Sequence, residues 1–265
     1  MMNGSYSTMA DHLIIPDGHA HPEYSNTRFD LVGKLIADVK PDVVIEMGDL
    51  GDMASLSPYD KGKKGYERNS YHRDVEVTVD AHERILFPMR KLKRKMPRLV
   101  KLWGNHEQRV NKAIELDHVL LEEVISPKDF QFEDNRWEVV PYTGSTPGII
   151  IVDGIAYSHY FTSGVMGRPI SGVHPAYQLL HKQYQSCVQG HTHTMDMCVR
   201  TKADGTYIMG IVAGVFVDYW MGYAGEANNL WWKGVIHLKN IENGFGDPEF
   251  ISMKALYDAY GDTLT

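Results

Sequence analysis

Cysteine is scarce in this sequence, with only Cys187 and Cys198 among 265 residues. Two cysteines cannot build the disulfide framework of a small secreted domain, and their rarity is typical of a reducing compartment. Long apolar runs are also missing, because the longest, YIMGIVAGVFV, is well short of the ~20 residues that a membrane-spanning helix needs. The first twelve residues carry neither a basic leader nor an apolar core, which disfavours a secretory signal. We therefore expect a cytoplasmic protein with no membrane partner.

An excess of positive charge is lacking too. The chain has 27 Lys and Arg against 34 Asp and Glu, which gives a formal net charge of −7. Proteins that coat duplex DNA neutralise its phosphates with a cationic face, so this balance disfavours that class while leaving room for a local basic groove. The hydrophobic fraction of 43% and the charged fraction of 23% are typical of a globular protein and not of a disordered one.

The chain shows no internal repeat and no low-complexity linker, so we predict a single domain over residues 1–265. Its first half alternates strands and helices. Strands are expected at 12–16, 42–47 and 98–103, with helices at 27–40, at about 74–95 and after residue 107. A polar segment at about 57–73 is too long for a routine connection and is interpreted as an insertion.

The second half changes to hairpins. Residues 148–159 and 197–211 each hold two strand-like runs joined through an Asp-Gly pair, which is a strong hairpin signal. A helix at 176–186 and a strand at 187–189 lie between these hairpins. Strand–helix alternation followed by hairpins predicts a mixed α/β fold with helices covering the outer faces of the sheets.

Polar clusters follow directly after five of the predicted strands. In α/β sheets the carboxyl ends of the strands share one edge, where ligand sites gather, and neighbouring strands are only ~5 Å apart. We therefore expect the clusters to converge. They are Asp17-Gly18-His19, Gly48 to Asp52, Gly104 to Glu107, Ser158-His159, and Gly190 to His193.

The side chains in these clusters are carboxylates, imidazoles and one amide. This mixture suits Mn²⁺, Fe, Zn²⁺ or Co²⁺ better than a thiolate metal or an all-oxygen Ca²⁺ site. There are too many ligands for one four-coordinate ion, but the number fits two ions that share a carboxylate. Such a pair stabilises the attacking and leaving oxygens of a phosphoryl group.

In this order the motifs DxH, GDxxD, GNHE, a lone His after a strand, and GHTH resemble the signature of calcineurin-like metallophosphoesterases. They run from Asp17 to His193, about two thirds of the chain. The compact chain with its GNHEQR segment is also similar to phosphoesterases encoded by tailed phages, which would act as nucleases or phosphatases in the host cytoplasm. The resemblance implies an αββα sandwich of four layers, with two mixed β-sheets flanked by helices.

The resemblance also implies a role for each motif residue in the hydrolysis of a phosphoester bond. Two divalent transition-metal ions are expected, most commonly Mn²⁺, with Fe, Zn, Co or Ni as alternatives, and they would activate water for in-line attack on phosphorus. The implied ligands are Asp17, His19 and His193 for the first ion, Asn105, His159 and His191 for the second, and Asp49 as the bridge.

By the same resemblance, His106 is no ligand but steadies the phosphate or protonates the leaving oxygen. Glu107 stands where a carboxylate commonly orients that histidine. Many family members continue GDxxD with Arg-Gly, whereas here Met53 follows Asp52. Arg109 is our candidate for the missing cation, with a solvated helix residue as the alternative. Further candidates for substrate contact are His21, Asp52 and Arg168.

Two other functions were weighed. The DGHAH segment also resembles the His-x-His opening of amidohydrolases and polymerase-type phosphoesterases, but that interpretation gives no role to GDLGD, GNHE or GHTH. A metal-free scaffold on the same fold would have lost ligands or the catalytic histidine, and here every expected position is filled.

For the substrate we favour a nucleotide or nucleic-acid phosphodiester, because KGKKGYERNSYHR interleaves cations with Tyr66 and Tyr71 as single-strand binders do. The alternatives are a plain surface loop, and a phosphomonoesterase acting on a phosphoprotein or a small metabolite. The Trp and Tyr residues of 218–232 are expected to pack a core edge or a subunit contact.

Overall fold

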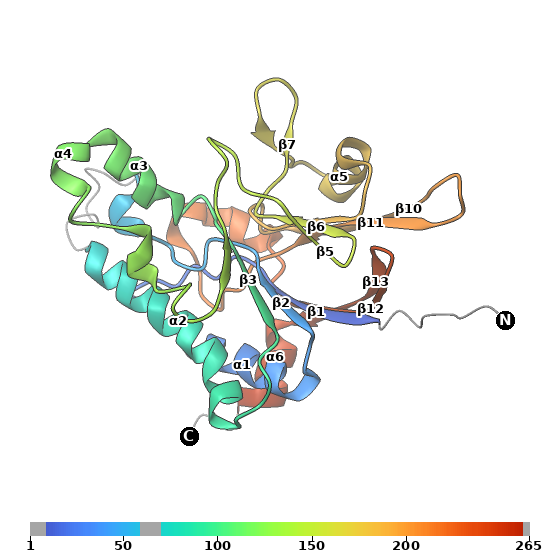
Figure 1. Ribbon diagram of the computed structural model, residues 1–265, viewed down its shortest axis with the longest axis horizontal. Helices are drawn as coiled ribbons and strands as arrows, with labels where there is room; N and C mark the ends of the chain where they lie inside the picture. The colour runs from blue at the N-terminus through green and yellow to red at the C-terminus, as the bar shows by residue number, and fades with distance from the viewer. Residues whose placement is uncertain (1–8, 59–69, 262–265) are drawn as a thin grey trace.

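The computed structural model of the protein describes residues 9–58 and 70–261 (Figure 1). Most of the expected insertion at about 57–73, including Lys61, Lys63, Lys64 and Arg68, lies outside the described residues. The single domain and its insertion therefore stay predictions. Among the described residues, no helix combines the length and the apolar character needed to cross a membrane.

A six-stranded mixed sheet has the order β13-β12-β1-β2-β3-β4. The four strands β1 to β4 are parallel, while β12 is antiparallel to β1 and β13 is antiparallel to β12. Because most residues of β1, β2 and β3 are buried on both faces, these strands hold apolar runs without alternation, whereas the edge strand β4 is only partly buried. Their bounds are β1 Ala10–Ile15, β2 Val43–Glu46, β3 Arg98–Leu102, β4 Glu138–Val140, β12 Gly234–Glu242 and β13 Phe245–Ser252.

A five-stranded mixed sheet has the order β10-β11-β9-β6-β5, with β11, β9 and β6 parallel and the two edge strands antiparallel to their neighbours. A separate small hairpin pairs β7 with β8. The bounds are β5 Ile150–Val152, β6 Ile155–Ser158, β7 Thr162–Ser163, β8 Arg168–Pro169, β9 Cys187–Gln189, β10 Met195–Thr201 and β11 Tyr207–Ala213.

Helices α1, α2 and α6 lie beside the six-stranded sheet, and α5 lies beside the five-stranded sheet (Figure 1). The α-helices are α1 Thr27–Val39, α2 Tyr71–Lys91, α3 Gln108–Leu116, α4 His118–Leu121, α5 Pro175–Gln183 and α6 Met253–Tyr260. Short 3₁₀ helices complete the elements: η1 Ala54–Leu56, η3 Pro127–Phe130 and η4 Gly222–Leu230.

Alternate residues of β1 enter different cores. Leu13 and Ile15 pack in a core that includes Phe29 and Ile36 of α1 and Ile85 of α2. Ile14 points the other way, into a core shared by the two sheets that is built from side chains such as Val100, Tyr157 and Ile211. A third core joins β6, β9 and β11 to Leu179 and Leu180 of α5. The two sheets therefore meet through apolar contacts, which fixes their strand ends relative to one another.

The predicted mixed α/β fold with two sheets and flanking helices is confirmed. Both Asp-Gly hairpins are present, as β5–β6 and β10–β11, and Asp153 and Gly154 have the positive φ values of 47° and 81° that a two-residue turn needs. The hairpin β12–β13 was not predicted, although Asn243-Gly244 between apolar runs carried the same signal.

Two helices differ from the prediction. Helix α2 begins at Tyr71 and not at Asp74, since the Tyr71 hydroxyl donates to Asp129 Oδ2 at 2.6 Å and holds the first turn. The single helix expected after residue 107 is interrupted at Asp117, whose φ of −142° is not helical. Beyond that break, Leu120 and Val124 are exposed and do not continue a buried face.

Candidate metal centre

The five polar clusters meet at the carboxyl ends of parallel strands from both sheets. In the first sheet, Ile15 of β1 lies level with Glu46 of β2, which lies level with Lys101 of β3. In the second sheet, Ser158 of β6 lies level with Gln189 of β9. Because each strand ends at the same height, the turns that follow come together, as expected for strand ends that form one edge.

Glycines before the ligands let these turns approach closely. A Cβ on Gly104 would lie 2.1 Å from Asp49 Oδ1, and a Cβ on Gly190 would lie 2.2 Å from Asp17 Oδ1. Both distances are far below any real contact, so a side chain at either position would displace a carboxylate of the site. The Gly that opens the GNHE motif and the Gly that opens GHTH are therefore required by packing against the neighbouring ligands.

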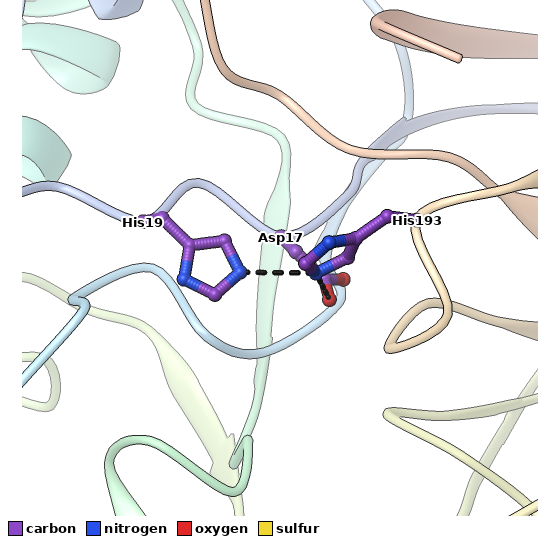
Figure 2. A group of neighbouring side chains, drawn as sticks. All are labelled: Asp17, His19 and His193. Carbon is purple, nitrogen blue, oxygen red and sulfur yellow. Dashed lines mark hydrogen bonds and ion pairs between the residues drawn. The ribbon is translucent and has the colours of Figure 1, made fainter. Parts of the chain in front are cut away.

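Asp17, His19 and His193 form the first group of buried side chains (Figure 2). One ligand atom from each lies within 4.8 Å of the others. The Nε2 atoms of His19 and His193 face each other at 3.1 Å, and His193 Nε2 is 3.2 Å from Asp17 Oδ2. Asp17 Oδ1 is buried without a hydrogen-bond partner. An unpartnered buried carboxylate oxygen beside two imidazole nitrogens fits a cation.

Asp49, His159 and His191 form the second group, again with ligand atoms within 4.8 Å of one another. His159 Nε2 lies 3.3 Å from Asp49 Oδ2 and 3.0 Å from Asn105 Oδ1. His191 Nδ1 lies 3.3 Å from the same His159 nitrogen. The structure thus brings together all seven residues expected as metal ligands. Together the two buried groups can bind metal ions.

The protonation preferences of these residues suit cation binding. Burial lowers the pKa of His191 to about 4 and also lowers that of His19, so both imidazoles are neutral ligands at pH 7. Burial opposes ionisation of Asp49, but the neighbouring His159 and His106 hold its pKa well below the usual value. Against the effect of burial, the Asp49 carboxylate raises the pKa of His159 to about 9. A bound cation would take the place of that imidazole proton.

Four of the seven candidate ligands have left-handed backbone conformations. The φ values are 42° for His19, 54° for Asp49, 68° for His191 and 61° for His193. Residues with a side chain seldom adopt this region, and each such conformation costs about 1–3 kcal/mol. Concentration of this strain on one set of residues is typical of a functional site, where it aims side chains that relaxed turns would point elsewhere.

Asp52 was expected to contact substrate, but the structure buries it between two histidines. Its Oδ1 lies 3.1 Å from His19 Nδ1 and 3.2 Å from His106 Nδ1. The same His106 nitrogen lies 2.6 Å from the Asp52 carbonyl oxygen. The other ring nitrogen of His106, Nε2, lies 3.8 Å from Asp49 Oδ2. Asp52 therefore positions both imidazoles, and its expected contact with substrate stays a prediction.

Glu107 was expected to orient His106, and this is corrected. Its carboxylate instead accepts backbone N–H bonds from Asp49 at 2.9 Å, Leu50 at 2.7 Å and Gly104 at 3.1 Å. It thereby fixes the turn that carries Asp49. Lys101 Nζ donates to Glu107 at 2.9 Å and also pairs with Glu46, and all three side chains are buried.

One lysine thus faces two carboxyl groups inside the protein. Burial raises the pKa of the Glu46 carboxyl to about 8, against the opposing effect of the Lys101 ammonium beside it. The ordinary pKa of a glutamate is 4.5, so between pH 4.5 and about 8 Glu46 takes up a proton when the chain folds. Glu46 therefore lowers the free energy of unfolding progressively as the pH rises from 4.5 to about 8.

We predict that Glu46→Gln removes this pH dependence, because the amide cannot ionise. Urea unfolding at several pH values should show the variant gaining stability relative to the wild type as the pH rises from about 5 to about 8. Glu138→Gln is the matched control, since Glu138 is an exposed partner of Arg98. A constant difference between wild type and Glu46→Gln across this range would contradict the assignment of the proton to Glu46.

The remaining residues expected to contact substrate are Arg109, His21 and Arg168. Arg109 donates to the carbonyl oxygens of Asp52 at 2.8 Å and Met53 at 3.1 Å, and its other terminal nitrogen is 3.2 Å from His106 Nε2. Its guanidinium therefore lies against the backbone that directly follows the GDLGD motif. The His21 ring contacts Tyr24 at 5.5 Å between centroids, next to the first motif. Arg168 is exposed on the β7–β8 hairpin.

Two supporting residues were missed by the sequence analysis. Arg28 is fully buried and donates to the carbonyl oxygens of Gly18 at 2.7 Å and Phe216 at 3.1 Å. The Tyr219 hydroxyl donates to the His19 carbonyl oxygen at 2.5 Å. Both hold the backbone of the first motif. No local signal marks Arg28, because an arginine in the first turn of a helix is ordinarily solvated.

The sequence matches no protein-family model, and no curated protein matches it. Among solved structures, the chain is similar to a conserved protein of Streptococcus pneumoniae TIGR4 that is described as a predicted phosphoesterase. The identity is 13%, over 93% of this chain and 91% of that chain, with a TM-score of 0.34. A likeness at that TM-score supports no conclusion about the activity of this chain.

Proposed function

We propose that this protein is a dinuclear metal-dependent phosphoesterase of the calcineurin-like type, with the four-layer αββα arrangement of that family. The observation that carries the proposal is the pair of carboxylate–imidazole groups, which come from the ends of β1, β2, β6 and β9 and are joined by the hydrogen bond from His191 N to Asp17 Oδ2. The bridging role of Asp49 is part of the proposal, and its support is that the buried Asp49 carboxylate lies in one group while the backbone N–H of His191, a member of that same group, donates to Asp17 of the other at 2.9 Å.

In this proposal Asp17, His19 and His193 hold one ion, Asn105, His159 and His191 hold the other, and Asp49 bridges them. The nitrogen and oxygen donors fit Mn²⁺, with Fe, Zn, Co or Ni as alternatives. When bound, such ions lower the pKa of water and stabilise charge on the phosphoryl oxygens. The protein's own contribution is to fix the ligands through Glu107, Arg28 and the strained turns.

His106 is proposed to give a proton to the leaving oxygen. The Asp52 carbonyl oxygen and carboxylate engage Nδ1, whereas Nε2 lies 3.2 Å from an Arg109 nitrogen that can only donate. The guanidinium would therefore turn toward the phosphate before a protonated Nε2 donates to the leaving oxygen. Arg109, at 3.2 Å from that Nε2, would supply the cation for the phosphate that the missing Arg after Asp52 does not. Its guanidinium is held by two carbonyl oxygens, so it is positioned before substrate arrives.

For the substrate we propose a phosphodiester of a nucleotide or a nucleic acid. The support is the interleaving of Lys, Arg and Tyr between residues 61 and 73 directly after the GDLGD motif. A phosphomonoesterase acting on a phosphoprotein or a small metabolite is the alternative activity, and a cytoplasmic location remains part of the proposal.

A substrate panel after reconstitution with Mn²⁺ tests this proposal. We expect hydrolysis of single-stranded oligonucleotides, dinucleotides or a chromogenic diester, loss of that activity in EDTA, and its return when Mn²⁺ is restored. Phosphomonoesters should be turned over more slowly than diesters. Preferential release of phosphate from monoesters would favour the phosphatase alternative. Absence of metal-dependent hydrolysis across the whole panel would overturn the assignment to a phosphoesterase.

A further inference from the structure

We propose that residues 218–232, here called the aromatic lobe, form a recognition surface beside the metal centre that stacks against a nucleobase of the substrate. This inference rests on the proposed function, because it names the group that lies next to the scissile phosphodiester. From the sequence, the same aromatic residues are expected in core packing or in a subunit contact.

The aromatic lobe is tied at both ends to backbone that carries candidate ligands. Just before it, Phe216 N donates to the Asp17 carbonyl oxygen at 2.8 Å. At its end, Trp232 N donates to the His193 carbonyl oxygen at 3.1 Å. Asp17 and His193 belong to the same ligand group (Figure 2). The lobe is therefore attached to two elements of the metal centre and is not a remote surface loop.

The interior of the lobe is held by one buried side chain. Asn228, which is 5% exposed, donates from Nδ2 to the carbonyl oxygens of Met221 at 2.9 Å and Gly225 at 2.8 Å, and its Oδ1 accepts from Met221 N at 3.0 Å. A side chain that satisfies three backbone groups replaces the hydrogen bonds of regular structure. The lobe is thereby preorganised, so little order has to be gained when a ligand binds.

On this fixed support the large aromatic side chains stay open to solvent. Trp220 is 50% exposed and Tyr223 is 60% exposed. The Trp231 ring meets the His193 imidazole edge to face, with 4.4 Å between centroids. The Tyr219 hydroxyl donates to the His19 carbonyl oxygen at 2.5 Å. The lobe therefore contacts candidate ligands through both Tyr219 and Trp231, while Trp220 and Tyr223 are exposed.

The side chains of the aromatic lobe suit a nucleobase better than a phosphate. The Lys233 ammonium next to it donates to the Tyr219 carbonyl oxygen at 3.0 Å, and Asp218 accepts from the Tyr257 hydroxyl at 2.6 Å. The charged side chains of the lobe itself, Asp218 and Glu226, are carboxylates that would repel a sugar–phosphate backbone. Exposed π faces are what remains, and each base that stacks on an aromatic side chain gains about 1–3 kcal/mol with little dependence on its identity. An alkyl phosphate or a phosphoserine would leave this surface unused.

The test compares two substrates with one backbone: a dinucleotide, and the corresponding dinucleotide without bases. Trp220→Leu and Tyr223→Leu keep apolar volume but remove the π face. We expect each to lower kcat/KM for the dinucleotide by roughly 5- to 100-fold, the factor that one stacked base contributes. Turnover of the abasic diester should be unchanged within about twofold. Tyr223→Phe, which keeps the ring, should retain most of the preference for bases.

Tyr207→Leu is the matched control, because Tyr207 is 50% exposed but lies at the opposite end of β11 from the metal centre. Tyr207→Leu should change kcat/KM for neither substrate. Equal losses on both diesters, or none on either, would overturn the inference. So would a change in molar mass by light scattering in Trp220→Leu or Tyr223→Leu, since that result assigns the aromatic lobe to a contact between two copies of the chain.

A binding measurement separates this inference from the proposed function. Adenosine carries a base but no phosphate, and its binding in EDTA can be followed by tryptophan fluorescence without any hydrolysis. We expect saturable quenching in the wild type that weakens by roughly 5- to 100-fold in Tyr223→Leu. Binding without metal-dependent hydrolysis would support the lobe and refute the phosphoesterase. Metal-dependent hydrolysis with neither a preference for bases nor adenosine binding would support the phosphoesterase and refute the lobe.

Discussion

Replacing Asp49 by Ala is expected to reduce hydrolysis by roughly 10³-fold or more and to lower the metal content of the protein. Dinuclear metal assistance is worth several kcal/mol of transition-state stabilisation, and each 1.4 kcal/mol corresponds to a tenfold change in rate. Asp49 lies 3.3 Å from His159 and accepts the backbone N–H of His106 at 2.8 Å. Its loss therefore disturbs ligands of one ion and the geometry of the proposed acid together.

The measurement is metal analysis of the reconstituted protein alongside kcat. About two ions per chain are expected for the wild type, and one or fewer for Asp49→Ala. Asp49→Asn keeps the shape of the side chain but removes its charge. It therefore separates the effect of the lost charge from the effect of the cavity that Ala leaves. Asp204→Asn, in the exposed turn of the β10–β11 hairpin, is the control. If Asp49→Ala binds as much Mn²⁺ as the wild type, the dinuclear model fails.

His106→Ala should lower kcat about 10²- to 10⁴-fold for diesters with poor leaving groups, while the ions stay bound. General-acid assistance has that magnitude, and it matters only where the leaving oxygen needs a proton. His106 contacts Asp52 and Arg109 and belongs to neither of the two groups proposed to hold metal, although with His19 and Asp52 it forms a third group whose ligand atoms lie within 4.8 Å of one another. Metal analysis of His106→Ala therefore accompanies the rate measurement.

The decisive comparison is between an alkyl or nucleoside leaving group and p-nitrophenolate, which departs without a proton. The loss caused by His106→Ala should be much smaller with p-nitrophenolate. His181→Ala, an exposed histidine on α5, serves as the control for the removal of an imidazole. Equal losses with both leaving groups would show that His106 does not act as the acid.

The expected metal ligands could be located from sequence because each one follows a buried strand directly. A run such as VVIE before GDLGD marks a strand end, and parallel strand ends share an edge. The adjoining glycines strengthened that signal, since Gly104 and Gly190 are required by the close approach of Asp49 and Asp17. Local sequence therefore indicated which residues converge at this edge, but it did not give the order of the strands in the sheets.

The roles that were assigned wrongly, or missed, depend on partners that are distant in sequence. Glu107 and Asp52 were both recognised as acidic, but only the fold decides which of them reaches His106 and which reaches the backbone of Asp49. Arg28 bonds to Phe216, 188 positions away, and no periodicity reports such a contact. The break at Asp117 was missed because apolar spacing does not reveal a single non-helical residue.

The left-handed turns at the candidate ligands have a consequence for the life of the protein in the cell. Strain and buried carboxylates weigh against the folded chain whenever the site holds no cation, whereas a ligand that binds only the folded state stabilises it by mass action, by about 4 kcal/mol at a thousand times its dissociation constant. Cellular proteases act on the unfolded fraction, which such a difference changes by a factor of roughly a thousand. The supply of transition metal would then set how many copies persist, as well as how many are active.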